Sequence, residues 1–112
     1  MKNKLHYAKE ARLDLDDIWD YIVGELSNVA AAAKTVNRIM DMVYQLADFP
    51  QMGTPLSSVS NAKSDYRFLV SGNYLIFYRE RGRDVYVDRV LYGRRDYLHT
   101  LLGKNHETEP VE

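Results

Sequence analysis

The spacing of apolar residues changes once along this chain of 112 residues, and that change restricts the folds open to it. In two segments, Lys9 to about Glu25 and about Val29 to Ala47, apolar side chains recur every three or four residues, as in amphipathic helices. The segment Phe49–Asn61, which contains prolines, a glycine and several serines, is predicted to be a loop. The residues after it alternate like strands, so a helical half is followed by a sheet half.

Three of the four predicted strands follow this loop. Tight turns at Ser71–Asn73 and Arg81–Arg83 join these three strands into an antiparallel series. The fourth strand precedes the first helix. The predicted strands are Lys4–Tyr7, Tyr66–Val70, Tyr74–Arg79 and Asp84–Tyr92.

The order of these elements, β-α-α-β-β-β, predicts one α+β domain in which a helical hairpin packs on a small antiparallel sheet. With both helices on one face, the other face of the sheet is expected to stay partly open and to present Arg and Tyr side chains. We assign residues 1–102 to this domain and expect a last helical turn at Tyr97–Leu102. The acidic tail, residues 103–112, is expected to be disordered.

The same patterns predict which side chains are buried. Trp19 falls at the helical spacing of the first helix, and Tyr21, Tyr44 and Tyr78 are also expected in the core. Four aspartates spread around the first helix, and a solvated face is the default interpretation for them. These aspartates are Asp14, Asp16, Asp17 and Asp20.

The composition excludes several classes of protein. The chain has no cysteine, which rules out disulfides and cysteine metal sites and suits a reducing compartment. Its three histidines share no metal-ligand spacing with carboxylates, so no metal or other cofactor is expected. The N-terminus lacks the apolar core of a signal peptide, and no apolar run approaches the roughly 20 residues of a membrane span. We therefore expect a cytoplasmic protein that does not contact a membrane.

Charge is distributed unevenly over a chain whose net charge is only −1. Residues 1–62 carry six Lys and Arg against eight Asp and Glu, whereas residues 63–104 carry nine against five, a local excess of +4. Residues 105–112 add three acidic groups and no basic one. Phosphate contacts supply most of the affinity for nucleic acids, so a chain this close to neutral is atypical of proteins that bind them.

Three stretches of the sheet half resemble the toxins of the bacterial RelE/ParE superfamily. They are the arginine-bearing strand Tyr66–Val70, the stretch Asn73–Arg79 with its Tyr-x-Ile-x-Tyr-Arg pattern, and Arg89–Tyr97 with its Gly-x-Arg turn. In the helical half, Asp14–Ile22 resembles the superfamily's first helix, and Leu46–Gly53 resembles its Leu-x-x-x-Pro-x-x-Gly helix exit. Each piece alone is weak, and the resemblance rests on their order and spacing over about residues 4–102.

The resemblance implies a growth-arresting toxin of a type II toxin–antitoxin module, as in plasmid stabilisation, neutralised by a cognate antitoxin encoded beside it. It implies contact with operator DNA only through the antitoxin. It also implies one of two targets: ParE-type members poison DNA gyrase, whereas RelE-type members cleave mRNA on the ribosome. The antitoxin is expected to lay a segment that is disordered when free over the apolar and basic surface, as a helix in a groove or as an added strand.

The two activities make different demands on the residues. A ribonuclease of this kind needs a base, a cation and an acid. The resemblance to RelE-type nucleases implies that Arg67 holds the phosphate, that Arg94 or Arg95 is the second arginine, and that Tyr97 is the late tyrosine. The lysines, or the glutamate and terminal histidine–tyrosine pair, of those nucleases are not matched. This gap and the near-neutral charge favour the ParE-type, non-enzymatic interpretation.

The residues expected to bind a target are Arg67, Arg94 and Arg95, together with Lys63 and Arg89. Structural roles are the alternative: Arg67 could pair with a carboxylate across the sheet, and the turn Arg94–Asp96 could be solvated, with Asp96 capping the last helix. A third hypothesis is a non-toxic module that only binds an antitoxin. The carboxylates considered as partners of Arg67 are Asp65, Asp84 and Asp88.

Overall fold

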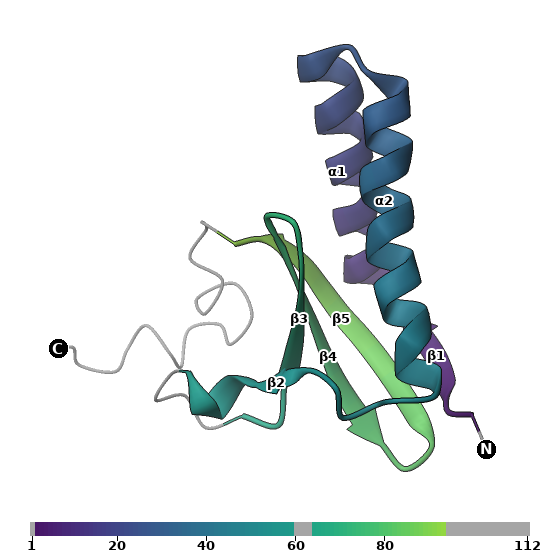
Figure 1. Ribbon diagram of the computed structural model, residues 1–112, viewed down its shortest axis with the longest axis vertical. Helices are drawn as coiled ribbons and strands as arrows, with labels where there is room; N and C mark the ends of the chain where they lie inside the picture. The colour runs from purple at the N-terminus through teal and green to yellow at the C-terminus, as the bar shows by residue number, and fades with distance from the viewer. Residues whose placement is uncertain (1, 60–63, 94–112) are drawn as a thin grey trace, which may run out of the picture.

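The computed structural model describes residues 2–59 and 64–93. Two long antiparallel helices pack on one side of a sheet, and the hairpin they form extends past the end of the sheet (Figure 1). The helices are α1 (Lys9–Leu26) and α2 (Val29–Tyr44), and α2 continues into the 3-10 turn η1 (Gln45–Ala47). The strands are β1 (Lys4–Tyr7), β2 (Thr54–Pro55), β3 (Arg67–Ser71), β4 (Tyr74–Arg81) and β5 (Asp84–Tyr92), and the 3-10 turn η2 (Leu56–Ser58) follows β2.

Two residues connect the helices and fix them as antiparallel neighbours. Ser27 ends α1 in the left-handed conformation, with φ of 50°. The side-chain oxygen of Asn28 then accepts a hydrogen bond from the backbone N–H of Ala31 at 2.9 Å, which caps the N-terminus of α2. Both predicted helices are therefore confirmed, with α2 passing into η1 at the end of its predicted range.

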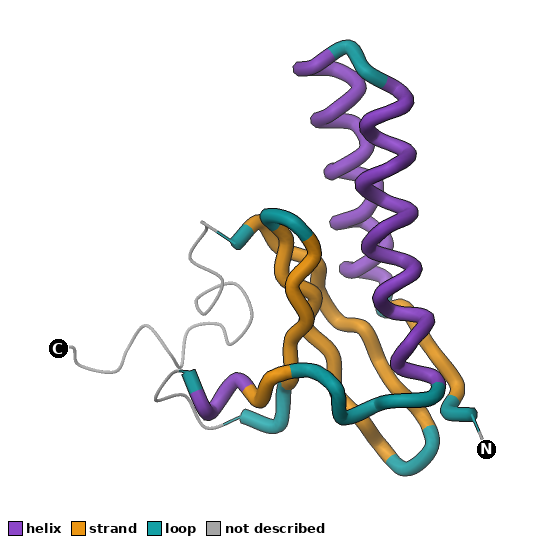
Figure 2. The backbone as a smooth tube through the Cα atoms, viewed as in Figure 1, coloured by secondary structure: helices purple, strands orange, loops and turns teal. Residues whose placement is uncertain are grey.

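The sheet has five strands in the order β1-β5-β4-β3-β2, so the first and last strands of the described chain are neighbours. The predicted antiparallel series β3, β4 and β5 is confirmed. Its two turns contain Gly72 and Gly82, whose φ values of 59° and 60° suit the first position of a type II′ turn. These turns are short, whereas a long connection joins α2 to β3 (Figure 2).

The edges of the sheet differ from the expectation. β1 pairs with β5 in parallel, from Lys4 opposite Asp84 to Tyr7 opposite Val87, so the sheet is mixed rather than wholly antiparallel. Both helices and the strands β2, β3 and β4 lie between these two strands in the chain, and such a long connection allows parallel pairing. The two-residue strand β2 lies inside the segment predicted to be a loop, and it pairs with β3.

The main core lies between the helical hairpin and the sheet. It combines the inward stripes of both helices with the side chains that β3, β4 and β5 direct toward them. These residues fill the interior almost completely, since each is at most 8% exposed. They include Ala11, Ile18 and Ile22 of α1, Ala32, Ile39 and Val43 of α2, and Leu69, Ile76, Tyr78, Val85, Val87 and Val90 of the sheet.

A second, smaller apolar cluster lies on the opposite face of the sheet. Phe77 alternates with Ile76 and Tyr78 along β4 and therefore points away from the helices. It is fully buried, and Leu91 of β5 is only 3% exposed in the same cluster, which also contains Leu56 of η2. The apolar part of the face that was expected to stay open is thus covered.

Burial of the aromatic residues agrees with the prediction only in part. Tyr78 is fully buried, as predicted. Trp19, Tyr21 and Tyr44 are 36%, 58% and 63% exposed, so the prediction that they lie in the core is wrong. The isoleucines of α1 already fill its inward stripe, and Tyr44 lies at the end of α2, where the ammonium of Lys2 approaches its ring centre to 5.3 Å.

Asp14 is not part of a solvated face, which corrects the default interpretation of the aspartates. It is 9% exposed and accepts three hydrogen bonds: from Nε and Nη2 of Arg89 at 2.8 and 2.9 Å, and from the backbone N–H of Val90 at 2.9 Å. Among the described residues, β1 accompanies β5 only as far as Tyr7 opposite Val87. Asp14 supplies the acceptor that β5 would otherwise lack on that edge. The other three aspartates are exposed, as expected.

We predict that Asp14→Ala lowers the free energy of unfolding by about 2–4 kcal/mol, because it leaves the Arg89 guanidinium and the Val90 N–H without their acceptor. Asp16→Ala is the matched control, since Asp16 is exposed on the same helix and the change has the same effect on helix propensity. The control should change the value by no more than about 0.5 kcal/mol. Urea unfolding measures both, and equal stability of the two variants would contradict the proposed role of Asp14.

Candidate functional site

Arg67, the residue expected to hold a phosphate, binds a loop of its own chain. It stands on β3 opposite Tyr78. Its Nη1 donates to the carbonyl oxygen of Gly53 at 2.8 Å and to that of Gln51 at 3.3 Å. The backbone N–H of Gly53 donates in turn to the Tyr78 hydroxyl at 2.9 Å. Arg67 and Tyr78 together attach the loop before β2 to the sheet.

The carboxylates considered as partners of Arg67 pair with other side chains. Each bond joins groups that are distant in the sequence or lie on neighbouring strands, so the sequence alone did not reveal the partners. The pairs are Asp65 with Arg81 at 2.6 Å, Asp84 with His6 at 2.8 Å and Asp88 with Arg79 at 2.8 Å.

Arg89 is the second expected target-binding residue that the structure describes. Its guanidinium forms the bidentate contact with Asp14, and this hydrogen bond raises the pKa of Arg89 above its ordinary value. Arg67 and Arg89 are thus not brought together at one site, because each donates to a different acceptor within the protein. The remaining expected site residues, Lys63, Arg94, Arg95 and Tyr97, lie outside the described residues.

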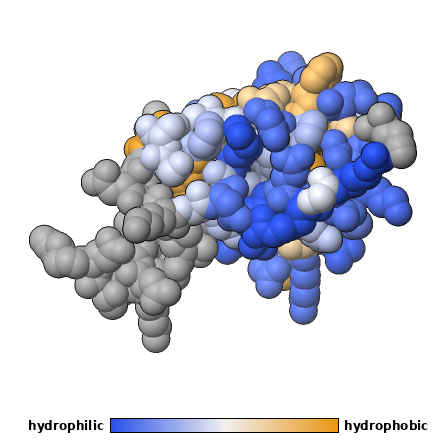
Figure 3. Space-filling model, turned by 90° about the horizontal axis from the view of Figure 1, so that it is seen from below, coloured by the Kyte–Doolittle hydropathy of each residue, from blue (hydrophilic) through white to orange (hydrophobic). Residues whose placement is uncertain are grey.

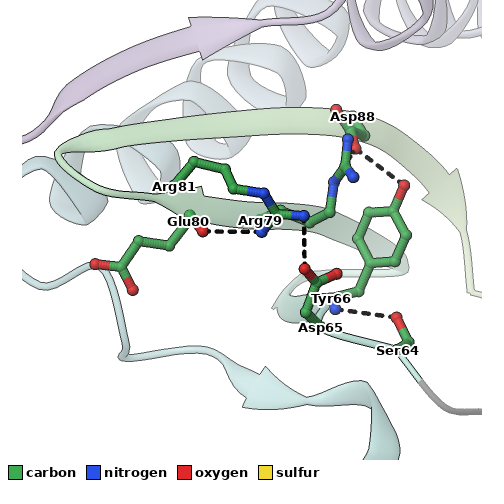
Figure 4. A network of polar contacts seen from close by, with 7 residues as sticks. All are labelled: Ser64, Asp65, Tyr66, Arg79, Glu80, Arg81 and Asp88. Atoms are coloured by element: carbon green, nitrogen blue, oxygen red, sulfur yellow. Dashed lines mark hydrogen bonds and ion pairs between the residues drawn. The ribbon is translucent and has the colours of Figure 1, made fainter.

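A polar network, shown in Figure 4, lies on the sheet face opposite the helices. The Tyr66 hydroxyl and the Nε of Arg79 both donate to Oδ2 of Asp88, at 2.9 and 2.8 Å. The guanidinium of Arg79 also lies over the Tyr66 ring, 5.2 Å from its centre. The neighbouring Arg81 contacts Asp65. The arginines and the tyrosine of this face are therefore occupied by acidic partners on the same face.

The environment of Tyr66 keeps its hydroxyl protonated. Burial raises the pKa of Tyr66 to about 12, and the hydrogen bond to Asp88 and its negative charge add to the effect. At neutral pH the group is a hydrogen-bond donor that already has an acceptor. It is poorly suited to act as a general base.

A groove of about 700 Å³ opens between the helical hairpin and the end of the sheet. Its walls are largely apolar, and three of its aromatic or aliphatic side chains are markedly exposed: Tyr21 at 58%, Leu26 at 59% and Tyr92 at 37%. Asp17 is the exposed charged residue among those that line it. Such a volume suits several apolar side chains of a bound segment rather than a small polar substrate. The other lining residues are Asp14, Ile18, Ile22, Thr35, Asn73, Tyr74, Val90 and Leu91.

The opposite end of the molecule has a different surface. Figure 3 shows the molecule from below, from the end where the β4–β5 turn lies. The described surface there is mostly hydrophilic, with only small hydrophobic areas. The exposed tip of the helical hairpin, by contrast, carries Leu26 and Val29, which are 59% and 58% exposed. The groove and the hairpin tip therefore both carry exposed apolar side chains.

Sequence reasoning missed Asp14, although a signal for it exists. Asp14 stands three residues after Ala11 and four before Ile18, within the buried stripe of α1, where an acidic residue requires a partner. No comparable signal marks the groove, because its walls come from four separate parts of the chain. Over residues 2–59 and 64–93, no group of three or more His, Asp or Glu residues could hold a metal ion, and no helix is long and apolar enough to cross a membrane.

The fold is shared with chains of two toxin–antitoxin systems. It superimposes on a chain of the chromosomal ParDE TA system from P. aeruginosa with a TM-score of 0.68 and 24% identity, covering 81% of this chain and 96% of that one. It also matches a chain of the E. coli DinJ–YafQ toxin–antitoxin complex with a TM-score of 0.51 and 13% identity, covering 92% of this chain and 100% of that one. At these identities the likeness shows the shared fold.

Sequence comparison identifies the family. Residues 5–97 match the family described as the ParE toxin of the type II toxin–antitoxin system parDE. Toxin ParE1 of Caulobacter vibrioides is 34% identical over 85 residues, which are 76% of this chain and 83% of that protein. The chain belongs to the ParE family of type II toxin–antitoxin toxins.

The loop held by Arg67 and Tyr78 leaves no room for a larger residue at position 53. A Cβ on Gly53 would lie 2.5 Å from the Tyr78 hydroxyl and 2.9 Å from the carbonyl oxygen of Phe68. We predict that Gly53→Ala lowers the free energy of unfolding by about 2–3 kcal/mol. Gly24→Ala is the control: nothing lies within 4 Å of a Cβ there, and alanine in α1 should stabilise the protein by about 0.5–1 kcal/mol. Chemical denaturation should show these opposite signs, and a neutral Gly53→Ala would contradict the close contact.

Proposed function

We propose that this toxin arrests growth by poisoning DNA gyrase and that it does not cleave RNA. Membership of the ParE family supports this target over the ribosome. The observation that carries the proposal is the state of the arginines. Arg67, which a RelE-type mechanism needs at the phosphate, donates to the carbonyl oxygens of Gln51 and Gly53. A guanidinium that holds a loop in this way must break those bonds before it can bind a phosphate.

The electrostatics of the sheet face support the same proposal. On the face opposite the helices, Arg79 and Arg81 are matched by Asp88 and Asp65. An RNA bound there would bring its phosphates close to both carboxylates, which reduces the gain from the arginines. A protein target that recognises shape and apolar contacts does not meet this difficulty.

The target is tested with the purified toxin in two parallel assays, DNA supercoiling by gyrase and integrity of mRNA in a translating extract. We expect inhibition of supercoiling at toxin concentrations that leave the mRNA intact. Cleavage of mRNA by the unmodified toxin would overturn the proposal in favour of the ribosome-dependent nuclease. Inactivity in both assays, and no growth arrest on expression, would instead support a non-toxic module that only binds an antitoxin.

Arg67→Ala requires a control in these assays because Arg67 also holds the loop at Gly53. Loss of activity in this variant therefore has meaning only if its melting temperature and circular dichroism match those of the parent protein. Gly53→Ala, which disturbs the same loop and keeps the arginine, separates the two effects. If Arg67 were a nuclease residue, Arg67→Ala would reduce mRNA cleavage far more than Gly53→Ala does when the two variants are compared at the same fraction of folded protein.

We further propose that a cognate antitoxin neutralises the toxin by placing an apolar segment in the groove. The groove offers exposed Tyr21, Leu26 and Tyr92 as contacts, and a chain of the ParDE system shares the fold. A helical segment with apolar residues on one side fits this shape. A basic residue beside the apolar side of that helix would face Asp17, the exposed charged residue that lines the groove.

We predict that Tyr21→Asp weakens the complex with the antitoxin at least about 10-fold, because it places an unpaired charge in the groove. Leu13→Asp is the matched control, since Leu13 is 50% exposed on the same helix and does not line the groove. Titration calorimetry with the antitoxin encoded beside the toxin gene measures both. A larger loss for Leu13→Asp than for Tyr21→Asp would place the antitoxin elsewhere.

A further inference from the structure

We propose that three tyrosines of the groove form an aromatic cage for a cationic side chain of the antitoxin. The cage consists of Tyr21 of α1, Tyr74 of β4 and Tyr92 of β5, and Asp17 lines the groove beside it. This proposal rests on the antitoxin entering the groove. It adds the chemical group that is recognised there, an arginine guanidinium or a lysine ammonium.

The two tyrosines of the sheet meet at an angle at the end of their strands. Tyr74 is the first residue of β4 and Tyr92 the last of β5, and the two are direct neighbours in the antiparallel pairing. Their ring centres are 5.8 Å apart, and the ring planes are inclined by 67°. Rings at this angle form two walls of a corner, which a third ring can complete to a cage. Tyr92 is 37% exposed, so part of its surface is available to a partner.

Tyr21 supplies the third ring from the helical side. It lines the same groove and is 58% exposed. It also lies close enough to Tyr74 for their charges to interact. Burial is the main cause that raises the pKa of Tyr74, and the negative charges of ionised Tyr92 and Tyr21 add to the effect. The three rings therefore converge on one region of the groove.

The charges beside the rings favour a cation over an anion. Asp17 precedes Tyr21 by one helical turn and so lies on the same side of α1. Asp14 is bound to Arg89, whereas Asp17 forms no ion pair within the part of the chain that the structure describes. No described Lys, Arg or His lines the groove. A bound carboxylate or phosphate would thus meet an acidic side chain and no basic one, whereas a cation is attracted by both the carboxylate and the ring faces.

Other tyrosines of the protein already bind cations of the same chain. The guanidinium of Arg79 lies 5.2 Å from the ring centre of Tyr66, and the ammonium of Lys2 lies 5.3 Å from that of Tyr44. Residues 2–59 and 64–93 place no such cation on the cage tyrosines. Within these ranges the cage therefore remains open to a cation of a partner.

The first test separates an aromatic contact from an apolar one. Tyr92→Phe keeps the ring, whereas Tyr92→Leu keeps only an apolar side chain. We expect the leucine variant to weaken the complex with the antitoxin encoded beside the toxin gene by roughly 5–20-fold, and the phenylalanine variant by less than about 3-fold. Tyr86→Leu is the matched control, since Tyr86 is also 37% exposed on β5 and does not line the groove.

Titration calorimetry measures all three variants, and their melting temperatures show that each is folded. Unchanged affinity of Tyr92→Leu would contradict the cage. So would an equal loss in Tyr92→Phe and Tyr92→Leu, because the hydroxyl rather than the ring would then be the group that binds.

The second test identifies the charge on the antitoxin. Each of its lysines and arginines is replaced in turn by methionine, which keeps an unbranched apolar chain and removes the charge. One of these variants should lose about as much affinity as Tyr92→Leu does, and combining the two changes should add little, because both remove the same contact. If Tyr92→Leu has the same effect with every antitoxin variant, an uncharged group occupies the cage and the proposal is wrong, although the groove remains the binding site.

The third test needs no antitoxin and therefore separates the cage from the proposed binding site. Tetramethylammonium chloride is titrated into the isotope-labelled free toxin, and tert-butyl alcohol serves as a neutral compound of similar shape. We expect the cation alone to shift the amide signals of Tyr21 and Tyr92, and Tyr92→Leu to abolish this response. Equal shifts with both compounds, or none with either, would overturn the proposal. A response to the cation combined with unchanged antitoxin affinity of Tyr21→Asp and Tyr92→Leu would show that the antitoxin binds elsewhere and is not the ligand of the cage.

Discussion

One carboxylate, that of Asp14, connects the two halves of the molecule. Apolar contact between the helical hairpin and the sheet is strong but has little direction, so by itself it allows α1 to slide along β5. The bidentate contact with Arg89 and the bond to the Val90 N–H fix a single position. The groove depends on that position, since Asp17 and Tyr21 follow Asp14 on α1 and face the end of β5.

Hydrophobic periodicity predicted the helices and the long strands because it reports which side of an element is buried. It could not predict the neighbours of each strand, and the parallel pairing of β1 with β5 brings together residues about 80 positions apart. It also overestimated the core. Tyr21 lies near the apolar stripe of α1, but no further layer formed by residues 2–59 and 64–93 covers it beside the groove.

The distribution of charge along the sequence was also a poor predictor of the binding site. The sequence shows that basic residues are concentrated after residue 62, and it suggested that they form one target-binding surface. The folded chain instead distributes the described arginines among separate acceptors: Arg67 holds a loop, Arg79 pairs with Asp88, and Arg89 pairs with Asp14. A count of charges cannot predict these partners, because one is a backbone carbonyl and another lies 75 residues away. The family resemblance was more informative than charge, since order and spacing of motifs reflect the fold as a whole.

The end of β5 contributes side chains to two surfaces of the protein at once. Leu91 belongs to the cluster facing away from the helices, whereas its neighbour Tyr92 lies against Tyr74, with ring centres 5.8 Å apart, on the helical side. One of these adjacent residues is buried and the other is 37% exposed, so the two faces differ in the apolar surface that they offer to a partner. An antitoxin that uses only the groove would leave the apolar cluster on the opposite face of the sheet unchanged. Neutralisation would then require no unfolding of the toxin, and the binding free energy would not be reduced by such a step.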